Sequence, residues 1–273
     1  MKIRFIDEYS SHEGGRLGRH VEHDPQSRAY ALSADLLPST YTSAVHTVRI
    51  PVLNQGDLGS CTGHAAEAFA GTDPLYDAIP ATAKARPTID TSTDETQAVA
   101  LYSAATRLDN VQGIYPPTDT GSTGVAVAKA AAKAGLISGY QHAFSLDSAL
   151  KALAVSPLIV GVNWYEGYDS PAADGLVKIS GSVRGGHEFL LYGIDATRQR
   201  VLARNSWGTS WGVQGTFQFS FDDLGRLLDE DGDATLFVPL MSPAPTPTPT
   251  PTPSAVDRAL ATSMHTWLSA KGL

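Results

Sequence analysis

Three residues that lie far apart in the sequence have the types that nucleophilic catalysis requires. Cys61 is the single cysteine, His187 opens an apolar run after two glycines, and Asn205 ends another apolar run. A thiolate attacks a carbonyl carbon, an imidazole moves the proton, and a side-chain amide holds the imidazole by its second nitrogen. The sequence therefore contains candidates for a nucleophile, a base and an orienting group.

The surroundings of Cys61 favour a reactive thiol over the more common buried structural cysteine. The residues after Ser60 are small and predict a helix over 61–70, with Ser60 as its N-cap. Unpaired N–H groups and the helix dipole at a helix start stabilise negative charge and lower the pKa of a thiol. We therefore expect Cys61 to be a low-pKa thiol.

The segments around these residues resemble the active-site blocks of the papain-like cysteine peptidases. Residues 55–61 read QGDLGSC, similar to the block that carries the family's nucleophile, and residues 205–215 read NSWGTSWGVQG, similar to the block that carries its asparagine. Between them, His187 opens an apolar segment, as the family's catalytic histidine does. The blocks follow one another in the family's order across residues 51–221, so chance agreement is remote.

The resemblance implies a peptidase that hydrolyses peptide bonds through a thioester acyl-enzyme. In it, Cys61 is the nucleophile, His187 the general base and later the acid for the leaving amine, and Asn205 the orienter. Gln55 would donate its side-chain amide to the oxyanion of the tetrahedral intermediate, together with the backbone N–H of Cys61. Trp207 would shield the bond between imidazole and amide from water and would also contribute to substrate binding.

Residues 119–122, just before a predicted helix, resemble the glycine-bearing loop with which the family pairs the substrate backbone. We expect Gly121 and Ser122 to contact the substrate there, although the family usually has two adjacent glycines at this place.

Glu188 directly follows the predicted base on a strand, where alternation sends neighbouring side chains to opposite faces. In the papain-like resemblance, however, this position borders the pocket for the second substrate residue. Two interpretations stay open. Glu188 is a core carboxylate, hydrogen-bonded or paired with Arg184 or Arg204, or it is a cleft carboxylate that attracts a substrate Lys or Arg.

The chain also departs from the family. Thr62 stands where an aromatic residue usually follows the nucleophile, which alters the cleft wall on the side of the leaving group. One cysteine rules out an intrachain disulfide, and in lacking disulfides the chain resembles the bacterial or phage-like branch. The segment before the core is too short for a long helical inhibitory propeptide, but it suits an extended strap over the cleft.

The order of the predicted elements indicates an α+β protein. Helices come first and short β-branched or aromatic segments follow, at 61–70, 96–108 and 124–134, then at 158–164, 175–180, 187–194, 200–205 and 215–221. The resemblance implies a two-subdomain fold with a helical N-terminal half, a β-rich C-terminal half and the cleft between them.

Composition divides the chain into four parts. We expect an N-terminal extension or strap at 1–45, a papain-like domain at 46–241, a Pro/Thr-rich linker at 242–254 and an amphipathic helix at 255–273. A lone helix of this length is marginal in water, so it should dock on a partner or fray.

A formal net charge of −8 and a pI of about 5.4 argue against a nucleic-acid partner, because such binding rests on Lys and Arg. No apolar run is long enough to predict a membrane span, and a peptide or protein is the expected substrate. Residues 1–8 reach acidic residues before a signal-like apolar region forms, so we expect a cytoplasmic protein, or one that is phage-encoded or released without a classical signal.

No cofactor or metal is expected. His12, His20 and His23 match no zinc template and are interpreted as solvated surface. The acidic run at 229–233 fails the calcium-loop pattern and is interpreted as a surface turn.

The sequence also allows other activities to be considered, those of a serine hydrolase, of an inactive binding module and of an amidase or acyl transferase. Residues 208–212 satisfy the G-x-S-x-G pattern of serine hydrolases, but the one histidine after Ser210 is His265, beyond the linker, so we reject that interpretation. An inactive papain-like binding module and an amidase or acyl transferase that uses the same three residues both remain open. The natural substrate, and endo- against exopeptidase action, are also left open.

Overall fold

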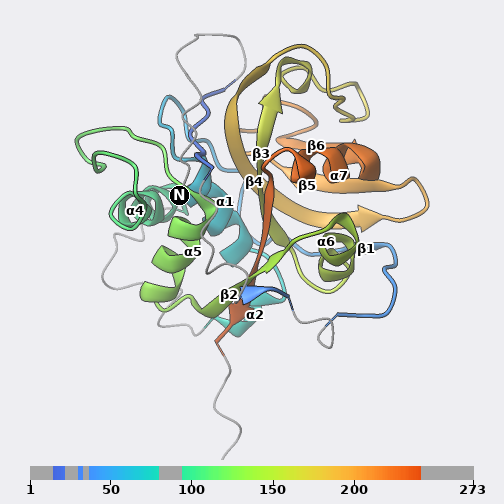
Figure 1. The fold of residues 1–273 in the computed structure, drawn as a ribbon, viewed down its shortest axis with the longest axis horizontal. Helices are drawn as coiled ribbons and strands as arrows, with labels where there is room; N and C mark the ends of the chain where they lie inside the picture. The colour runs from blue at the N-terminus through green and yellow to red at the C-terminus, as the bar shows by residue number, and fades with distance from the viewer. Residues whose placement is uncertain (1–14, 22–29, 33–36, 80–93, 241–273) are drawn as a thin grey trace, which may run out of the picture. The chain divides into compact units, whose positions relative to one another are not determined.

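The structure is a computed structural model that describes residues 15–21, 30–32, 37–79 and 94–240. Its helices are α1 (Cys61–Ala70), α2 (Leu75–Ala78), α4 (Asp94–Ala105), α5 (Gly124–Lys133), α6 (Leu146–Leu153), the short 3-10 helix η3 (Glu166–Tyr168) and α7 (Phe221–Asp229) (Figure 1). Its strands are β1 (Ala44–Val45), β2 (Ile137–Ala143), β3 (Leu158–Tyr165), β4 (Val183–Asp195), β5 (Arg200–Arg204), β6 (Thr216–Ser220) and β7 (Asp233–Pro239). The predicted linker at 242–254 and helix at 255–273 lie outside the described residues.

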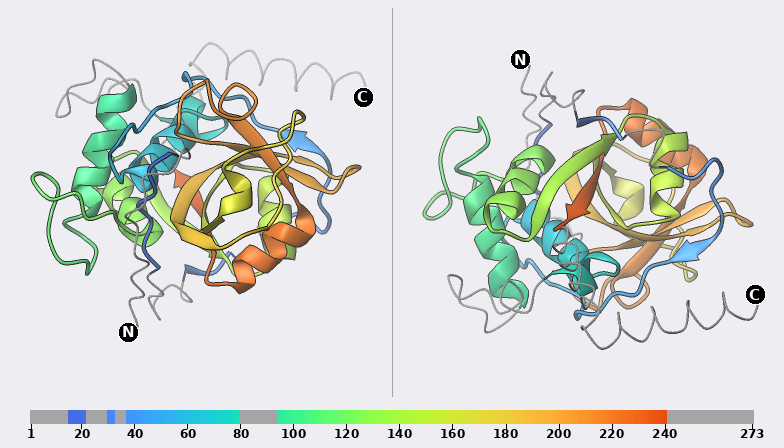
Figure 2. Two further views of the ribbon diagram at one scale, coloured as in Figure 1. Left: turned by 90° about the horizontal axis from the view of Figure 1, so that it is seen from above. Right: turned by 90° about the horizontal axis from the view of Figure 1, so that it is seen from below.

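The strands form one sheet in the order β2-β7-β3-β4-β5-β6, and β1 adds to β4 off this path. Every ladder between these strands is antiparallel. Helices α1, α4 and α5 gather on one side of the sheet and α6 and α7 on the other, as both views of Figure 2 show. The predicted α+β class, with a helical first half and a β-rich second half, is confirmed.

The sheet separates two apolar cores, because neighbouring side chains of a strand point to opposite faces. On β3, Val160 and Val162 belong to the core shared with α6 and α7, whereas Ile159 belongs to the core shared with α1, α4 and α5. On β4, Phe189 and Leu190 divide in the same way. The position of a residue along β4 therefore decides which half of the molecule its side chain enters.

Helix α1 begins at Cys61, as predicted, and every residue of it is buried. Its small residues allow the close approach of α4, since a Cβ on Gly63 would lie 2.2 Å from the backbone oxygen of Ala98. Ser60 is the N-cap residue, but its side chain caps no backbone N–H and instead lies 3.1 Å from the Nδ1 of His64. The predicted start of this helix is confirmed, and the predicted capping bond is wrong.

Other predicted elements differ from the structure. The predicted helix at 96–108 lies at 94–105. The predicted strand at 175–180 is absent from this described segment, where Leu176 makes one isolated bridge to Gln218. Gly175 there has a φ of +81°, a left-handed conformation that interrupts a strand. Helices α6 and α7 and strands β2 and β7 were not predicted.

Candidate active site

His187 and Asn205 are joined directly. The Nε2 of His187 donates to the Oδ1 of Asn205 over 2.7 Å, and the same oxygen accepts the backbone N–H of Ser206 at 2.8 Å. An oxygen that accepts two hydrogen bonds fixes the proton of His187 on Nε2, so its Nδ1 carries a lone pair. That Nδ1 is buried and has no hydrogen-bond partner among the described residues.

Two tryptophans enclose the imidazole. The centroid of the Trp207 ring lies 4.8 Å from the centroid of the His187 ring, and the centroid of the Trp164 ring lies 4.9 Å from it. This burial lowers the pKa of His187 to about 3, against the opposing effect of the Asn205 bond. Trp207 covers the imidazole, as its predicted shielding role requires, and the histidine is neutral in this arrangement.

Cys61 is the first residue of α1, which packs against β4, and it is completely buried. One helical turn further on lies His64, a residue that sequence analysis missed. Its Nδ1 lies 2.9 Å from the backbone oxygen of Ser60 and its Nε2 lies 3.0 Å from Oε2 of Glu95. The contact between α1 and β4 places the helix that begins with Cys61 against the strand that carries His187. The spacing Cys61-x-x-His64 on one predicted helix was the available signal.

Gln55 is tied to the segment that follows Asn205. Its backbone N–H donates to the oxygen of Ser206 at 2.8 Å, and its Oε1 accepts the Ser206 hydroxyl at 2.6 Å. Its Nε2 donates to the backbone oxygen of Leu58 at 2.8 Å, which uses one of the two amide hydrogens. The predicted oxyanion donor is therefore held between the loop before Cys61 and the loop after Asn205.

Asp119 holds the loop before Cys61 in place. Its carboxylate accepts the backbone N–H of Gly59 at 2.9 Å, the hydroxyl of Tyr102 at 2.6 Å and a guanidinium N–H of Arg16 at 3.1 Å. The sequence marks Asp119 only as the first residue of the glycine-bearing loop, and no sequence signal links it to Gly59. It is a positioning residue for the segment that leads into α1.

Residues 15–21 belong to the segment predicted as a strap at 1–45, and from here on the strap means these residues; they run in contact with every predicted catalytic segment. The backbone N–H groups of Gly18 and Arg19 donate to the oxygen of Gly186, at 3.2 and 2.9 Å. On the other side, Ser122 donates its N–H to Gly18 at 2.9 Å and accepts the N–H of His20 at 2.8 Å. The strap is thus hydrogen-bonded between the residue before His187 and the predicted substrate-binding loop.

Close glycine contacts fix the path of the strap. A Cβ on Gly18 would lie 2.1 Å from the backbone oxygen of Gly59, and a Cβ on Gly15 would lie 2.5 Å from the Trp207 ring. Gly121 has a φ of +67°, and its Cβ would lie 2.4 Å from the oxygen of Gly18. Within the described residues, the strap therefore covers the place where the predicted site residues converge.

Glu188 lies on the face of β4 opposite to His187 and is completely buried. Neither of its predicted arginine partners pairs with it. Arg184 donates to Oδ1 of Asp169, and Arg204 donates to the backbone oxygen of Ile50 at 3.0 Å. The charges close enough to shift its pKa belong to Asp233 and Arg19, which sequence analysis had not connected to it.

One surface assignment is wrong, and a second holds for the turn but not for the role of its last residue. His20 is 8% exposed, and its Nε2 lies 2.6 Å from the backbone oxygen of Thr120, because the strap carries it against the glycine-bearing loop. The acidic run at 229–233 does form a turn, but Asp233 enters β7 and pairs with the buried Arg19. His12 and His23 lie outside the described residues. Over the described ranges, no group of three or more His, Cys, Asp or Glu side chains could hold a metal ion.

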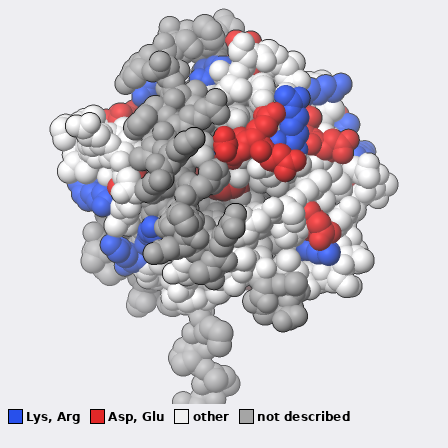
Figure 3. Space-filling view, in the orientation of Figure 1, with Lys and Arg blue, Asp and Glu red and all other residues white. Residues whose placement is uncertain are grey.

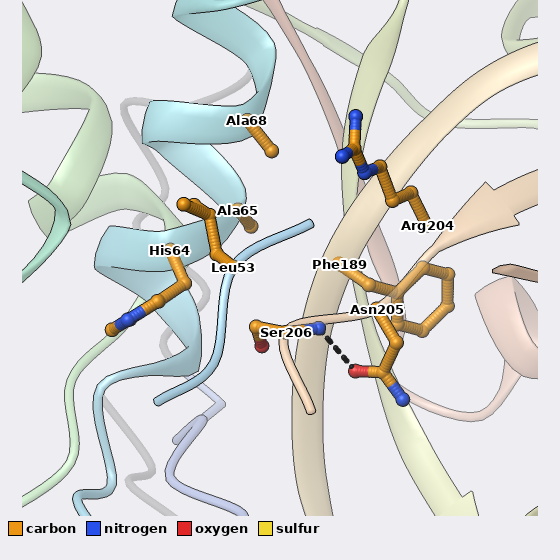
Figure 4. A pocket seen from close by; sticks show the side chains of 8 residues that line it. All are labelled: Leu53, His64, Ala65, Ala68, Phe189, Arg204, Asn205 and Ser206. Atoms are coloured by element: carbon orange, nitrogen blue, oxygen red, sulfur yellow. Dashed lines mark hydrogen bonds between the residues drawn. The ribbon is translucent and has the colours of Figure 1, made fainter. Parts of the chain in front are cut away.

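A small cavity of about 10 Å³ lies between α1 and the strands β4 and β5 (Figure 4). Apolar side chains line it together with His64, Arg204, Asn205 and Ser206. Such a volume holds about one water molecule and no substrate side chain. The cavity lies beside Asn205, and no residue of the strap lines it.

No protein-family model matches the sequence, and the comparison with curated proteins gives no match. Xylellain, a cysteine protease from Xylella fastidiosa, superposes with a TM-score of 0.61 at 16% identity, over 86% of this chain and 100% of that one. The chain has the papain-like fold. Less similar are the proform of the ragweed protease Amb a 11 (TM-score 0.49, 15% identity, 89% of this chain and 70% of that one) and procathepsin L 3 of Tenebrio molitor (0.49, 13%, 81% and 83%).

The face of this papain-like chain that Figure 3 draws is mixed in charge. On the face drawn in Figure 3, acidic side chains gather in one area with basic ones beside them. Among the described residues, no helix has the length and apolar character needed to cross a membrane.

Proposed function

We propose that this chain is a cysteine peptidase in which Cys61 attacks the peptide carbonyl, His187 moves the proton and Asn205 orients His187. The observation that carries the proposal is the 2.7 Å bond between His187 and Asn205, which leaves the Nδ1 lone pair of His187 without a partner among the described residues. A base oriented in this way beside a helix that starts with a cysteine is the arrangement that generates a thiolate nucleophile.

In the proposed reaction, Nδ1 of His187 takes the Cys61 proton and the thiolate adds to the carbonyl carbon. Gln55 Nε2 and the backbone N–H of Cys61 stabilise the oxyanion, and His187 then protonates the leaving amine. A thioester remains on Cys61 until water, activated by the same imidazole, hydrolyses it. An amidase or acyl transferase would share every step up to the choice of acceptor.

The test is cleavage of a peptide library by the full chain, with the strap weakened by Gly18→Ala. The added methyl meets a backbone oxygen at 2.1 Å, whereas the control Gly139→Ala meets nothing within 4 Å. We expect cleavage and rapid iodoacetamide labelling near pH 6 in Gly18→Ala, and slower labelling in the control because Cys61 is buried.

Cys61→Ala and His187→Ala should each abolish cleavage, while His46→Ala, a change at a half-buried histidine outside the site, should not. A thiol that reacts only near pH 8.5, with no cleavage in any variant, would contradict the proposal and favour an inactive binding module. Product formed only with an added amine acceptor would identify an acyl transferase.

A further inference from the structure

His64 and Glu95 link α1 with α4 beside the loop that leads into α1. The Nε2 of His64 lies 3.0 Å from Oε2 of Glu95, the second residue of α4. His64 is 1% exposed, and its side chain extends from α1 away from Asn205 (Figure 4). The helices approach closely because Gly63 has no side chain, and a Cβ there would lie 2.2 Å from the backbone oxygen of Ala98, one helical turn after Glu95. The pair therefore joins the two helices at their N-terminal ends.

The other ring nitrogen of His64 orients a backbone N–H group. Its Nδ1 lies 2.9 Å from the backbone oxygen of Ser60, which also accepts the backbone N–H of His64 at 3.1 Å. A carbonyl oxygen only accepts hydrogen bonds, so Nδ1 is the donor. The oxygen of Ser60 and the N–H of Cys61 belong to one planar peptide group and point in opposite directions. By holding the oxygen, His64 sets the direction of the Cys61 N–H, one of the two oxyanion donors in the proposed reaction.

The carboxylate of Glu95 holds the backbone directly before the second oxyanion donor. Its Oε1 accepts the backbone N–H of Asn54 at 2.6 Å. The oxygen of the same peptide group, that of Leu53, accepts the N–H of Gly208 at 3.0 Å. This peptide group is thus held from both sides, and the next residue is Gln55. One carboxylate connects the backbone before Gln55 with the ring that orients the other donor.

The loop between the two donors needs such support. Residues 55–60, all of which the structure describes, form neither helix nor strand, and Gly56 among them has a φ of +58°. Stabilisation of an oxyanion depends on donors that are already placed where the charge develops. A displacement of about 1 Å at a reacting centre can cost about 100-fold in rate. The bonds of His64 and Glu95 hold this loop at its two ends.

We propose that His64 and Glu95 are positioning residues that hold both oxyanion donors, the Cys61 N–H and the Gln55 side chain, in one fixed arrangement. The inference rests on the proposed function, which assigns the oxyanion to these donors. Both residues act through backbone bonds and not on the substrate itself.

The experiment uses the full chain with the strap weakened in two ways, so that the result does not depend on one of them. Gly18→Ala is the first parent chain, but its methyl meets Gly59, close to the loop under test. Arg19→Ala is the second parent chain, because it weakens the strap at the bond to Asp233 and leaves Gly59 untouched. Each further variant is compared with the parent chain that carries the same strap change, and urea unfolding gives the folded fraction to which kcat refers.

Glu95→Ala removes both acceptors, whereas Glu95→Gln is the conservative variant. Glutamine keeps an oxygen for the Asn54 N–H, and its amide N–H can donate to the Nε2 lone pair of a neutral His64. The matched control is Asp174→Ala. The Asp174 carboxylate also divides its oxygens, accepting the backbone N–H of Leu176 at 3.1 Å and a guanidinium N–H of Arg200 at 2.8 Å.

We expect Glu95→Ala to lower kcat about 10- to 100-fold while KM changes less than about threefold, because the donors act mainly in the transition state. Glu95→Gln and the control Asp174→Ala should each stay within about threefold of the parent chain. His64→Gln keeps a donor for Glu95 and loses the one for Ser60, so we expect a lower kcat than in His64→Asn, which keeps a donor at the place of Nδ1.

Two probes separate the oxyanion donors from the thiol. Alkylation of Cys61 by iodoacetamide needs the thiolate but forms no oxyanion, so we expect its rate in Glu95→Ala to stay within about threefold of the parent chain. A peptide aldehyde adds to Cys61: the sulfur bonds to the aldehyde carbon, the π electrons of the C=O bond move to oxygen, and the thiol proton passes to that oxygen. The matching peptide alcohol cannot react. Glu95→Ala should weaken binding of the aldehyde at least about tenfold, and binding of the alcohol less than about threefold.

An unchanged kcat in Glu95→Ala, an equal loss in Glu95→Gln, or an alkylation rate that falls as far as kcat would each overturn the inference. The proposed function is judged separately, by cleavage and alkylation in the two parent chains. Parent chains that cleave, with Glu95→Ala as active as they are, keep the proposed function and lose the positioning pair.

Parent chains that cleave nothing lose the proposed function, and amide hydrogen exchange over residues 54–61 then decides about the pair. Exchange that is at least about tenfold faster in Glu95→Ala than in Asp174→Ala would show that the pair holds this loop. Equal exchange in the two variants would overturn the inference without any reference to catalysis.

Discussion

Replacing His187 by glutamine should remove a specific loss of stability in acid. The native pKa of His187 is lowered to about 3, first because burial disfavours its charged form. The unfolded chain has a histidine pKa of about 6.5. Below that pH the unfolded state binds a proton that the native state does not, so stability is fully present above pH 6.5 and falls as the pH drops.

The magnitude follows from the difference between the two pKa values. Each pH unit below 6.5 costs about 1.4 kcal/mol until the native histidine also protonates. The free energy of unfolding should therefore fall by about 2 kcal/mol between pH 8 and pH 5 through this one residue, and by about 4 kcal/mol in total by pH 3. Glutamine retains an N–H group that can reach Asn205 but does not titrate.

The assay is urea unfolding of the wild type and His187→Gln at pH 8 and pH 5, followed by tryptophan fluorescence. The lowered pKa values of His46 and His142 act in the same direction in both proteins, so the difference between the two proteins isolates His187. We expect the wild type to lose about 2 kcal/mol more than the variant. Equal losses would refute the inference that His187 is buried and neutral.

Two further predictions concern the support of the site and the end of the chain. Ser206→Ala breaks the 2.6 Å bond to Oε1 of Gln55, so we expect about 1 to 3 kcal/mol lower stability and a fall in kcat greater than any rise in KM, measured by unfolding and steady-state kinetics. An unchanged kcat would show that the orientation of Gln55 does not depend on Ser206. Truncation after Met241 removes the Pro/Thr-rich segment and the amphipathic stretch, and we expect unchanged turnover of small peptides and a stability change below about 2 kcal/mol. A larger loss of stability or of solubility would mean that residues 255–273 pack on the papain-like domain.

Features that depend on residue type and on spacing over a few residues could be predicted from the sequence. The helix at 61–70 was predicted with its observed bounds, because a run of small residues behind Ser60 has few alternatives to a close-packed helix. The pairing of His187 with Asn205 followed from residue types and from the order of the motifs, and the structure brings the two within 2.7 Å. Such features depend on side-chain identity and short-range spacing, which a sequence states directly.

Long-range pairing of strands decided the rest. The sequence predicts a surface turn for Asp233 because an acidic run is normally solvated. Only the register of β7 on β3 and of β3 on β4 places Asp233 in one row with Gly161 and Glu188. No sequence pattern predicts that Arg19 is buried, because it lies in a polar segment without hydrophobic periodicity. Its burial depends on backbone bonds to Gly186 and Ser122, residues that lie more than 100 positions away in the sequence. Local sequence patterns do not indicate contacts between residues that lie so far apart in the chain. The buried pair of Arg19 and Asp233 therefore forms only when the sheet and residues 15–21 are in place.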